Sequence, residues 1–279
     1  MQKQRVRVIN LEMNIVYACN LKCEYCTHLG RLMKGLVPFN DLLTWYKTWN
    51  SKIHPDNVRI MGGEPLLHPD LEKIIYETRA HWKSSCIELI TNGLLLTKMK
   101  NDIFTAIKET ETNVTISKHF DDPYYNRMLG KGIVALKYHG IMPQLSQSNK
   151  LWMKCYQINS EGVRKPYRSD PQKAWNICYV KNLCTTLLDN KLYRCPQLGC
   201  YSHARKMGWI DQGWETVLDY KPLTPECTRD ELVDFITMGA CDQCSICPEE
   251  FQYADMYEKV NLFGLSSFQK HFFCAENHE

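Results

Sequence analysis

Cys19-Asn-Leu-Lys-Cys23-Glu-Tyr-Cys26 is the stretch that decides the fold of this 279-residue chain. Its Cys-x3-Cys-x2-Cys spacing places three thiols on one short loop. A closed cluster of four irons normally takes four protein ligands, whereas this loop offers only three. The spacing therefore predicts an iron–sulfur cluster in which one iron keeps an open position, with Cys19, Cys23 and Cys26 as its ligands.

A structural zinc site, or a set of unconnected buried thiols, is the alternative interpretation of this triplet. Zinc sites usually show two Cys or His pairs, and no second pair stands close to the triplet. His28 is near enough to ligate, although a histidine next to a cysteine loop more often supports the ligands or faces solvent. The isolated triplet favours the cluster.

Two glycine-containing segments follow the triplet. Val58-Arg-Ile-Met-Gly62-Gly63-Glu64-Pro65 is a short apolar run that stops at paired glycines, as a buried parallel strand ending in a tight loop does. Glycine has no Cβ and lets the backbone approach a ligand closely. Ile87 to Gly93 reads as a further strand that ends in an Asn-Gly turn, which by itself would be ordinary turn chemistry.

Taken in this order, the cysteine triplet, the aromatic Tyr25 and the Gly-Gly-Glu-Pro loop resemble the radical S-adenosylmethionine (SAM) enzymes. The resemblance implies that SAM binds the open iron and yields a 5′-deoxyadenosyl radical, which takes a hydrogen atom from the substrate. It also implies cofactor contacts from seven residues: Tyr25, Gly62, Gly63, Glu64, Thr91, Asn92 and Ser117. Glu64 is expected to help bind the SAM amino group. Lys118 is a further candidate, for which a solvent-facing position is the alternative.

Strand-like and helix-like runs alternate over the first half of the chain, which predicts an α/β fold with a parallel sheet and helices outside it. The expected strands are Val6 to Val16, Val58 to Met61, Ile87 to Thr91, Asn113 to Ser117 and Ile141 to Leu145. The expected helices are Asn40 to Trp49, Pro69 to Trp82, Asn101 to Glu109 and Pro123 to Tyr138. The candidate residues fall at carboxyl ends of strands, where parallel barrels bind ligands. The resemblance implies a partial (β/α)6 TIM-like barrel, with an indistinct sixth unit around Lys154 to Val163.

Composition narrows the class of protein. The chain is 44% hydrophobic with a net charge of +3, so it can bury a full core and has no basic field for nucleic acid. No run approaches the roughly 18 apolar residues of a membrane span. Without a signal-like N-terminus, fourteen cysteines indicate metal or redox chemistry in a reducing compartment, and we expect a cytoplasmic protein.

The pattern changes after about Pro171, where the alternation stops and nine of the fourteen cysteines follow. We therefore expect a barrel over residues 1–170 and a second, cysteine-rich module over residues 171–279. Within this module, Thr185 to Tyr193 alternates about Asp189-Asn190, which predicts a β-hairpin. Thr228-Arg-Asp-Glu231 is a capping box that predicts a helix ending near Gly239.

The cysteines around this hairpin and helix resemble the twitch module, a shortened SPASM domain. Asn190 stands where the twitch pattern has glycine, a mild departure because Asn also tolerates positive φ. The resemblance implies one auxiliary [4Fe–4S] cluster bound by Cys178, Cys195, Cys241 and Cys244. Cys184 and Cys247 are the reserve ligands, and a zinc site of four thiolates is the alternative. A full SPASM domain with two auxiliary clusters would draw on Cys200, Cys227 and Cys274.

The resemblance covers nearly the whole chain but names no substrate. We expect an oxidoreductase or epimerase that dehydrogenates or inverts a carbon of a carbohydrate or cyclitol, with flavodoxin or ferredoxin as electron donor. Larger relatives that modify peptides often carry an N-terminal peptide-binding domain, and this sequence begins almost at its first strand. Peptide modification, or activation of a partner enzyme, is the alternative. The seven cysteines outside the two predicted clusters, Cys155 and Cys200 among them, are all candidate hydrogen donors, and no catalytic residue is assigned.

Overall fold

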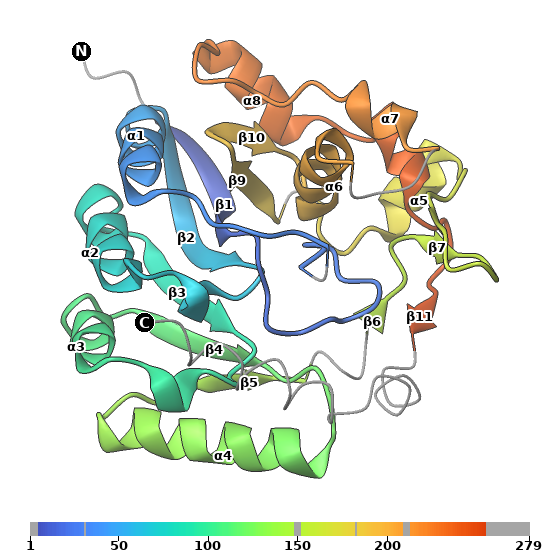
Figure 1. Cartoon of the computed structure of the whole chain (residues 1–279). Helices are drawn as coiled ribbons and strands as arrows, with labels where there is room; N and C mark the ends of the chain where they lie inside the picture. Colours follow the sequence, from blue (N-terminus) through green and yellow to red (C-terminus); the bar gives the residue numbers. More distant parts are fainter. Residues whose placement is uncertain (1–4, 31, 148–151, 182, 209–212, 255–279) are drawn as a thin grey trace.

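A seven-stranded sheet organises the protein, as the computed structural model shows (Figure 1). The structure describes residues 5–30, 32–147, 152–181, 183–208 and 213–254. The strand order is β10-β9-β1-β2-β3-β4-β5, and all neighbouring strands run parallel except the β9–β10 pair. In a parallel sheet the carboxyl ends of the strands meet at one edge, and the candidate site lies at that edge.

The first half of the chain alternates strands and helices, as predicted. The strands are β1 (Val6–Val16), β2 (Ile53–Gly62), β3 (Cys86–Thr91), β4 (Asn113–Ser117) and β5 (Gln144–Ser146). The helices are α1 (Phe39–Asn50), α2 (Leu71–His81), α3 (Asn101–Glu109) and α4 (Pro123–Tyr138), with short 3-10 turns η1 (Pro65–Leu67) and η2 (Leu96–Lys98). This arrangement confirms the α/β class and the partial barrel.

Helices α1 to α4 follow one another along the outer side of the curved sheet (Figure 1). Their apolar residues recur at helical spacing, which gives each helix one face to bury. In α1 this face consists of Leu42, Trp45, Tyr46 and Trp49, all of them buried. Burial of large aromatic side chains holds the helices on the sheet and leaves its carboxyl edge free for ligands.

The sixth β/α unit expected around Lys154 to Val163 is absent from the described residues. The segment instead forms two-residue strands, β6 (Trp152–Met153), β7 (Gln157–Ile158) and β8 (Arg164–Lys165). β7 and β8 pair antiparallel with each other and stay outside the main sheet. A parallel strand needs an apolar run and a long crossover connection, and this segment supplies neither.

The C-terminal part contains the predicted hairpin and capped helix. Its elements are α5 (Pro171–Ile177), β9 (Thr185–Leu188), β10 (Lys191–Tyr193), α6 (Pro196–Lys206), α7 (Glu215–Leu218), α8 (Arg229–Thr237), η4 (Asp242–Ile246) and β11 (Tyr253–Ala254). Asp189 and Asn190 form the hairpin turn with φ of 50° and 56°. Thr228 and Glu231 form the capping box at the start of α8. In the described part of the chain, no helix is long and apolar enough to cross a membrane.

The hairpin is attached directly to the barrel. Strand β9 pairs parallel with β1, so the C-terminal part extends the barrel sheet at the β1 edge. At the hairpin turn, Asp189 accepts a hydrogen bond of 2.6 Å from the Tyr17 hydroxyl, and its other carboxylate oxygen lies 2.9 Å from His203 Nδ1. Tyr17 comes just before Cys19, so these bonds connect the cysteine loop to the C-terminal part.

Candidate active site

A cavity of about 440 Å³ opens at the carboxyl edge of the barrel strands. This volume lies in the range usual for pockets that bind cofactors and small ligands. The cavity brings together most residues that the sequence predicted for cofactor binding: Cys19, Cys23, Tyr25, Cys26, Gly62, Gly63, Thr91, Asn92 and Ser117. Residues from the ends of β1, β2, β3 and β4 therefore meet in one site.

The cysteine loop leaves β1 and turns back tightly under the cavity. Gly30 makes this turn possible, because a Cβ at this position would lie only 2.6 Å from Cys19 Cβ. The Cys19 thiol accepts a hydrogen bond of 3.4 Å from the Leu21 amide. Burial raises the pKa of the Cys19 and Cys26 thiols. Metal binding would therefore have to release their protons. The three thiols on one loop fit the three-ligand cluster that the spacing predicts.

The paired glycines lie against the end of β1. The amide of Gly63 donates to Val16 O at 2.8 Å, and the amide of Glu64 donates to Ala18 O at 2.9 Å. Gly62 has a φ of +145°, and a Cβ at this position would collide with Val16 O at the end of β1. A Cβ on Gly63 would collide with Ala18 O, just after β1. The glycines therefore have two effects. They allow the two loops to pack together, and they expose their backbone to the cavity.

Glu64 departs from its expected geometry. Its side chain is fully buried and is not among the residues that line the cavity. The carboxylate accepts hydrogen bonds from Leu66 N (3.1 Å), Thr91 Oγ1 (2.7 Å) and Asn92 N (2.9 Å). Burial raises its pKa to about 7. This geometry favours an indirect role, in which Glu64 positions the Thr91–Asn92 loop rather than contacting the cofactor.

The other predicted contacts occupy the cavity wall in different ways. Asn92 donates to Asn20 Oδ1 at 2.7 Å and so joins the end of β3 to the cysteine loop. The Tyr25 ring packs 5.2 Å from that of Tyr156, and this contact connects the cysteine loop to the segment between β6 and β7. Lys118 forms an ion pair of 2.8 Å with Asp121 and is not among the lining residues. Its predicted cofactor contact is therefore not supported by this geometry.

Sequence reasoning missed several lining residues. These are Thr27, His119, Ser146, Gln147, Met153 and Tyr179. His28, noted in the sequence only as a neighbour of the cysteine loop, lines the cavity as well. Ser146 ends β5 and Gln147 follows it, so the strand-end rule that found Ser117 would also have found them. His119 had no such signal. Burial lowers the pKa of both His28 and His119 to about 4, so both rings are neutral near pH 7.

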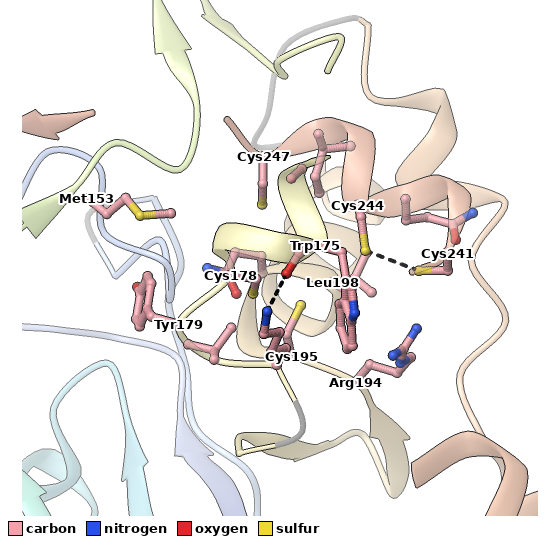
Figure 2. A pocket seen from close by; sticks show the side chains of 16 residues that line it. Met153, Trp175, Cys178, Tyr179, Arg194, Cys195, Leu198, Cys241, Cys244 and Cys247 are labelled. Atoms are coloured by element: carbon pink, nitrogen blue, oxygen red, sulfur yellow. Dashed lines mark hydrogen bonds between the residues drawn. The ribbon is translucent and has the colours of Figure 1, made fainter. Parts of the chain in front are cut away.

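A second pocket lies beside the cavity and contains five cysteines (Figure 2). They come from the end of α5, the end of β10 and the η4 region: Cys178, Cys195, Cys241, Cys244 and Cys247. Met153 and Tyr179 line both this pocket and the cavity. All four predicted auxiliary ligands are thus brought together, along with one of the two reserve cysteines, and two side chains border both sites.

The remaining cysteines lie elsewhere. Cys184, the other reserve ligand, accepts a hydrogen bond of 3.7 Å from Arg59 inside the barrel and does not line the five-cysteine pocket. Cys200 and Cys227 are buried in the core, and Cys155 is fully buried with Gln197 Nε2 3.5 Å from its sulfur. Cys274 lies outside the described residues. The described residues therefore do not support a second auxiliary cluster. They also do not support a cysteine that faces the cavity and donates a hydrogen atom to the substrate.

The five-cysteine pocket offers ligands that suit either an iron–sulfur cluster or zinc. Zinc needs its sulfur ligands about 2.3 Å from one point. In the described residues no three Cys, His, Asp or Glu side chains converge on a single ion. A four-iron cluster is a larger body and takes thiolates that surround a space. Lys181 and Arg194 also line this pocket, and their positive charges can offset thiolate charge.

Comparison with known families identifies the barrel. The family described as the Radical SAM superfamily matches residues 13–136, which include the cysteine loop, the glycine loop and strands β3 and β4. The barrel part of the chain is therefore similar to radical SAM domains. The family implies a [4Fe–4S] cluster and SAM, for which the three-thiol loop and the cavity supply fitting residues.

Curated relatives match only in part. GTP 3′,8-cyclases from Clostridium acetobutylicum and Trichodesmium erythraeum are 35% and 31% identical over 101 residues each. Each match covers 34% of this chain, and the chain spans about a third (31%) of each relative's length.

One solved structure resembles nearly the whole chain. BtrN in complex with AdoMet and 2-DOIA has a TM-score of 0.53 at 15% identity, covering 91% of this chain and 99% of that chain. At this level of identity the likeness shows the fold, which extends beyond the barrel into the cysteine-rich part.

Proposed function

We propose that this chain is a radical SAM enzyme that removes a hydrogen atom from a small polar molecule. The proposed substrate class is a carbohydrate or cyclitol, and the reaction is dehydrogenation or epimerisation. The observation that carries the proposal is the far wall of the cavity, where His119, Ser146 and Gln147 follow or end strands β4 and β5. Hydroxyl, imidazole and amide groups in a concave site can hydrogen-bond several hydroxyl groups of one small molecule.

We assign cofactor binding to one side of the cavity and substrate binding to the other. Cys19, Cys23 and Cys26 would hold the cluster, and Gly62, Gly63 and the Thr91–Asn92 loop would hold SAM. When bound, this pair supplies a 5′-deoxyadenosyl radical that takes hydrogen from a C–H bond. The opposite wall would orient the substrate. The resemblance to BtrN supports this division, because its structure holds AdoMet together with 2-DOIA.

The proposal includes one auxiliary [4Fe–4S] cluster in the five-cysteine pocket, with Cys178, Cys195, Cys241 and Cys244 as its predicted ligands. The grouping of these thiols beside the cavity supports it. Met153 and Tyr179 would then separate substrate from the auxiliary cluster by one layer of side chains. An electron donor such as flavodoxin or ferredoxin is part of the same proposal.

A substrate screen tests the proposed reaction. The reconstituted protein would be incubated anaerobically with dithionite, SAM and one of four sets of compounds: sugars, cyclitols, GTP or peptides. We expect sugars or cyclitols to increase 5′-deoxyadenosine over the no-substrate rate. Substrate carrying deuterium at the reacting carbon should transfer it to 5′-deoxyadenosine. An increase confined to GTP or peptides would contradict the proposed substrate class.

The cysteine triplet permits a separate test of the barrel cluster. We expect the wild-type chain to hold about eight irons, and a variant with Cys19, Cys23 and Cys26 all replaced by Ala to hold about four. The variant should lose SAM cleavage completely. Cys227→Ala, which removes a buried thiol outside both sites, is the matched control. SAM cleavage that survives in the triple variant would remove the basis of the assignment.

A further inference from the structure

The five-cysteine pocket holds one thiol more than a four-iron cluster binds. We propose that Cys241 and Cys247 are interchangeable fourth ligands of the auxiliary cluster, with Cys178, Cys195 and Cys244 common to both ligand sets. The inference rests on the auxiliary cluster of the proposed function. It assigns a ligand role to Cys247, which the sequence analysis names only as a reserve ligand.

The backbone around η4 presents the three cysteines in equivalent ways. The Cys244 amide donates to Cys241 O at 2.8 Å, and the Cys247 amide donates to Cys244 O at 3.2 Å. The same three-residue turn therefore occurs twice in succession. A 3-10 helix has three residues per turn, so side chains three positions apart lie on the same face. Cys244 lies within η4, and Cys241 and Cys247 flank it three positions away on either side.

The two flanking cysteines also share a backbone conformation. Cys241 precedes η4 with φ −124° and ψ 164°, and Cys247 follows it with φ −96° and ψ 161°. Both conformations are extended, and neither side chain is committed to the interior of the short helix. Either thiol can thus supply a ligand without unwinding η4, and either one forms a Cys-x2-Cys pair with Cys244.

The side chains point into the pocket from different sides. In Figure 2, Cys178, Cys195, Cys244 and Cys247 surround a shared space, and Cys241 lies on the far side of Cys244. The Cys241 and Cys244 sulfurs are 3.8 Å apart. Cys247 packs against the hydrophobic core, whereas Cys241 lies on the side of Arg194. With Cys247 as the fourth ligand, the cluster would therefore lie further inward, toward Met153 and Tyr179, which also line the cavity.

Exchange between the two sets needs no oxidant or reductant. The iron–sulfur bond to one thiolate breaks as the bond to the other forms, and a proton passes from the incoming thiol to the departing one. Reduction potentials of such clusters depend on solvent exposure and on hydrogen bonds to the sulfurs. The two sets should differ in both, since Cys241 lies on the side of Arg194 and Cys247 packs against the core.

Single and double variants test the exchange through iron content. We expect Cys241→Ala and Cys247→Ala each to keep about eight irons per chain, as in wild type, and the double variant to keep about four. The two single variants should also differ from each other in the midpoint potential and electron paramagnetic resonance spectrum of the auxiliary cluster. Cys227→Ala is the control for loss of a thiol, and far-ultraviolet circular dichroism reports folding.

The outcomes separate this inference from the proposed function. If one single variant alone falls to about four irons, the ligand set is fixed and the exchange is wrong, while the auxiliary cluster stands. A double variant that keeps about eight irons would also overturn the exchange, because another group would then be the fourth ligand. If wild type itself holds only about four irons, the auxiliary cluster is absent and the proposed function fails first.

Discussion

Glu64 shows how a motif residue can act through its neighbours. Its carboxylate is buried between the glycine loop and the Thr91–Asn92 loop and accepts hydrogen bonds from both sides. Three donors favour the charged form, whereas burial favours the neutral form. Burial dominates, because the pKa is raised from its ordinary value of 4.5 to about 7. The residue is therefore a titrating contact between the glycine loop and the Thr91–Asn92 loop.

This raised pKa predicts a pH-dependent stability. The folded state holds the Glu64 proton more tightly than the unfolded state, so the stabilisation is complete below about pH 4.5 and is lost as pH rises through about 7. Glu64→Gln cannot titrate. Between about pH 5.5 and about pH 8, the free energy of unfolding of wild type should fall by about 2 kcal/mol relative to the variant.

Urea denaturation of the cluster-free protein at several pH values measures this difference. The slope with pH is diagnostic, whereas a constant offset between the proteins reports only altered hydrogen bonding. Glu161→Gln makes the same chemical change on an exposed turn and is the matched control. A flat difference for Glu64→Gln would show that the buried carboxylate is already ionised across this range.

At the scale of elements, the glycine loop packs tightly against the end of β1 and the residues that follow it. Gly63→Ala would push a Cβ against Ala18 O and force the two loops apart. We expect this variant to lose about 1–3 kcal/mol of stability, the usual cost of inserting a methyl group into a filled space. Because Gly63 lines the cavity, SAM should also bind more weakly, as a titration of the reconstituted protein would show.

Gly130→Ala is the matched control. Gly130 lies in α4, and nothing lies within 4 Å of a Cβ at this position. Replacing a helical glycine by alanine should therefore stabilise the protein by about 0.5–1 kcal/mol. Equal stability of Gly63→Ala and wild type would mean that the loops can separate freely, and that the close approach has no part in binding.

The sequence predicted the elements well where their signals were local. Helices α3 and α4 and strand β4 have the predicted bounds, because apolar periodicity and turn residues stand next to each other in the chain. The pairing of β9 with β1 was missed, since it joins residues more than 170 positions apart. The same limit applies to the metal ligands: spacing grouped Cys184 with Cys247 as reserves, and only the fold separates them.

The candidate site was predictable in part for the same reason. The strand-end rule and the motifs located Gly62, Thr91 and Ser117, because each follows a recognisable strand. The direction of the Glu64 carboxylate was not predictable, since it depends on donors from β3. Tyr179 was missed because its role depends on the position of α5 beside the barrel, which no local pattern encodes.

At the scale of the whole molecule, two groups of thiols lie on either side of a thin wall. The barrel group is held by the loop after β1, and the auxiliary group by α5, β10 and η4. Met153 and Tyr179 face both sites. Because separate elements hold the two groups of thiols, loss of one cluster should leave the other cluster able to assemble. Substrate turnover, which we expect to need both clusters, should fail.

Removal of the auxiliary cluster tests this division of labour. Cys178→Ala combined with Cys195→Ala removes the two ligands that both proposed sets share, so the chain should fall from about eight irons to about four. SAM cleavage at the barrel cluster should persist without substrate, because Cys19, Cys23 and Cys26 are untouched. Substrate turnover should be lost, because Met153 and Tyr179, which line the cavity, would no longer have the auxiliary cluster behind them. Unchanged iron content, or SAM cleavage lost in step with turnover while Cys227→Ala behaves as wild type, would show that the cysteine-rich part is a structural support of the barrel.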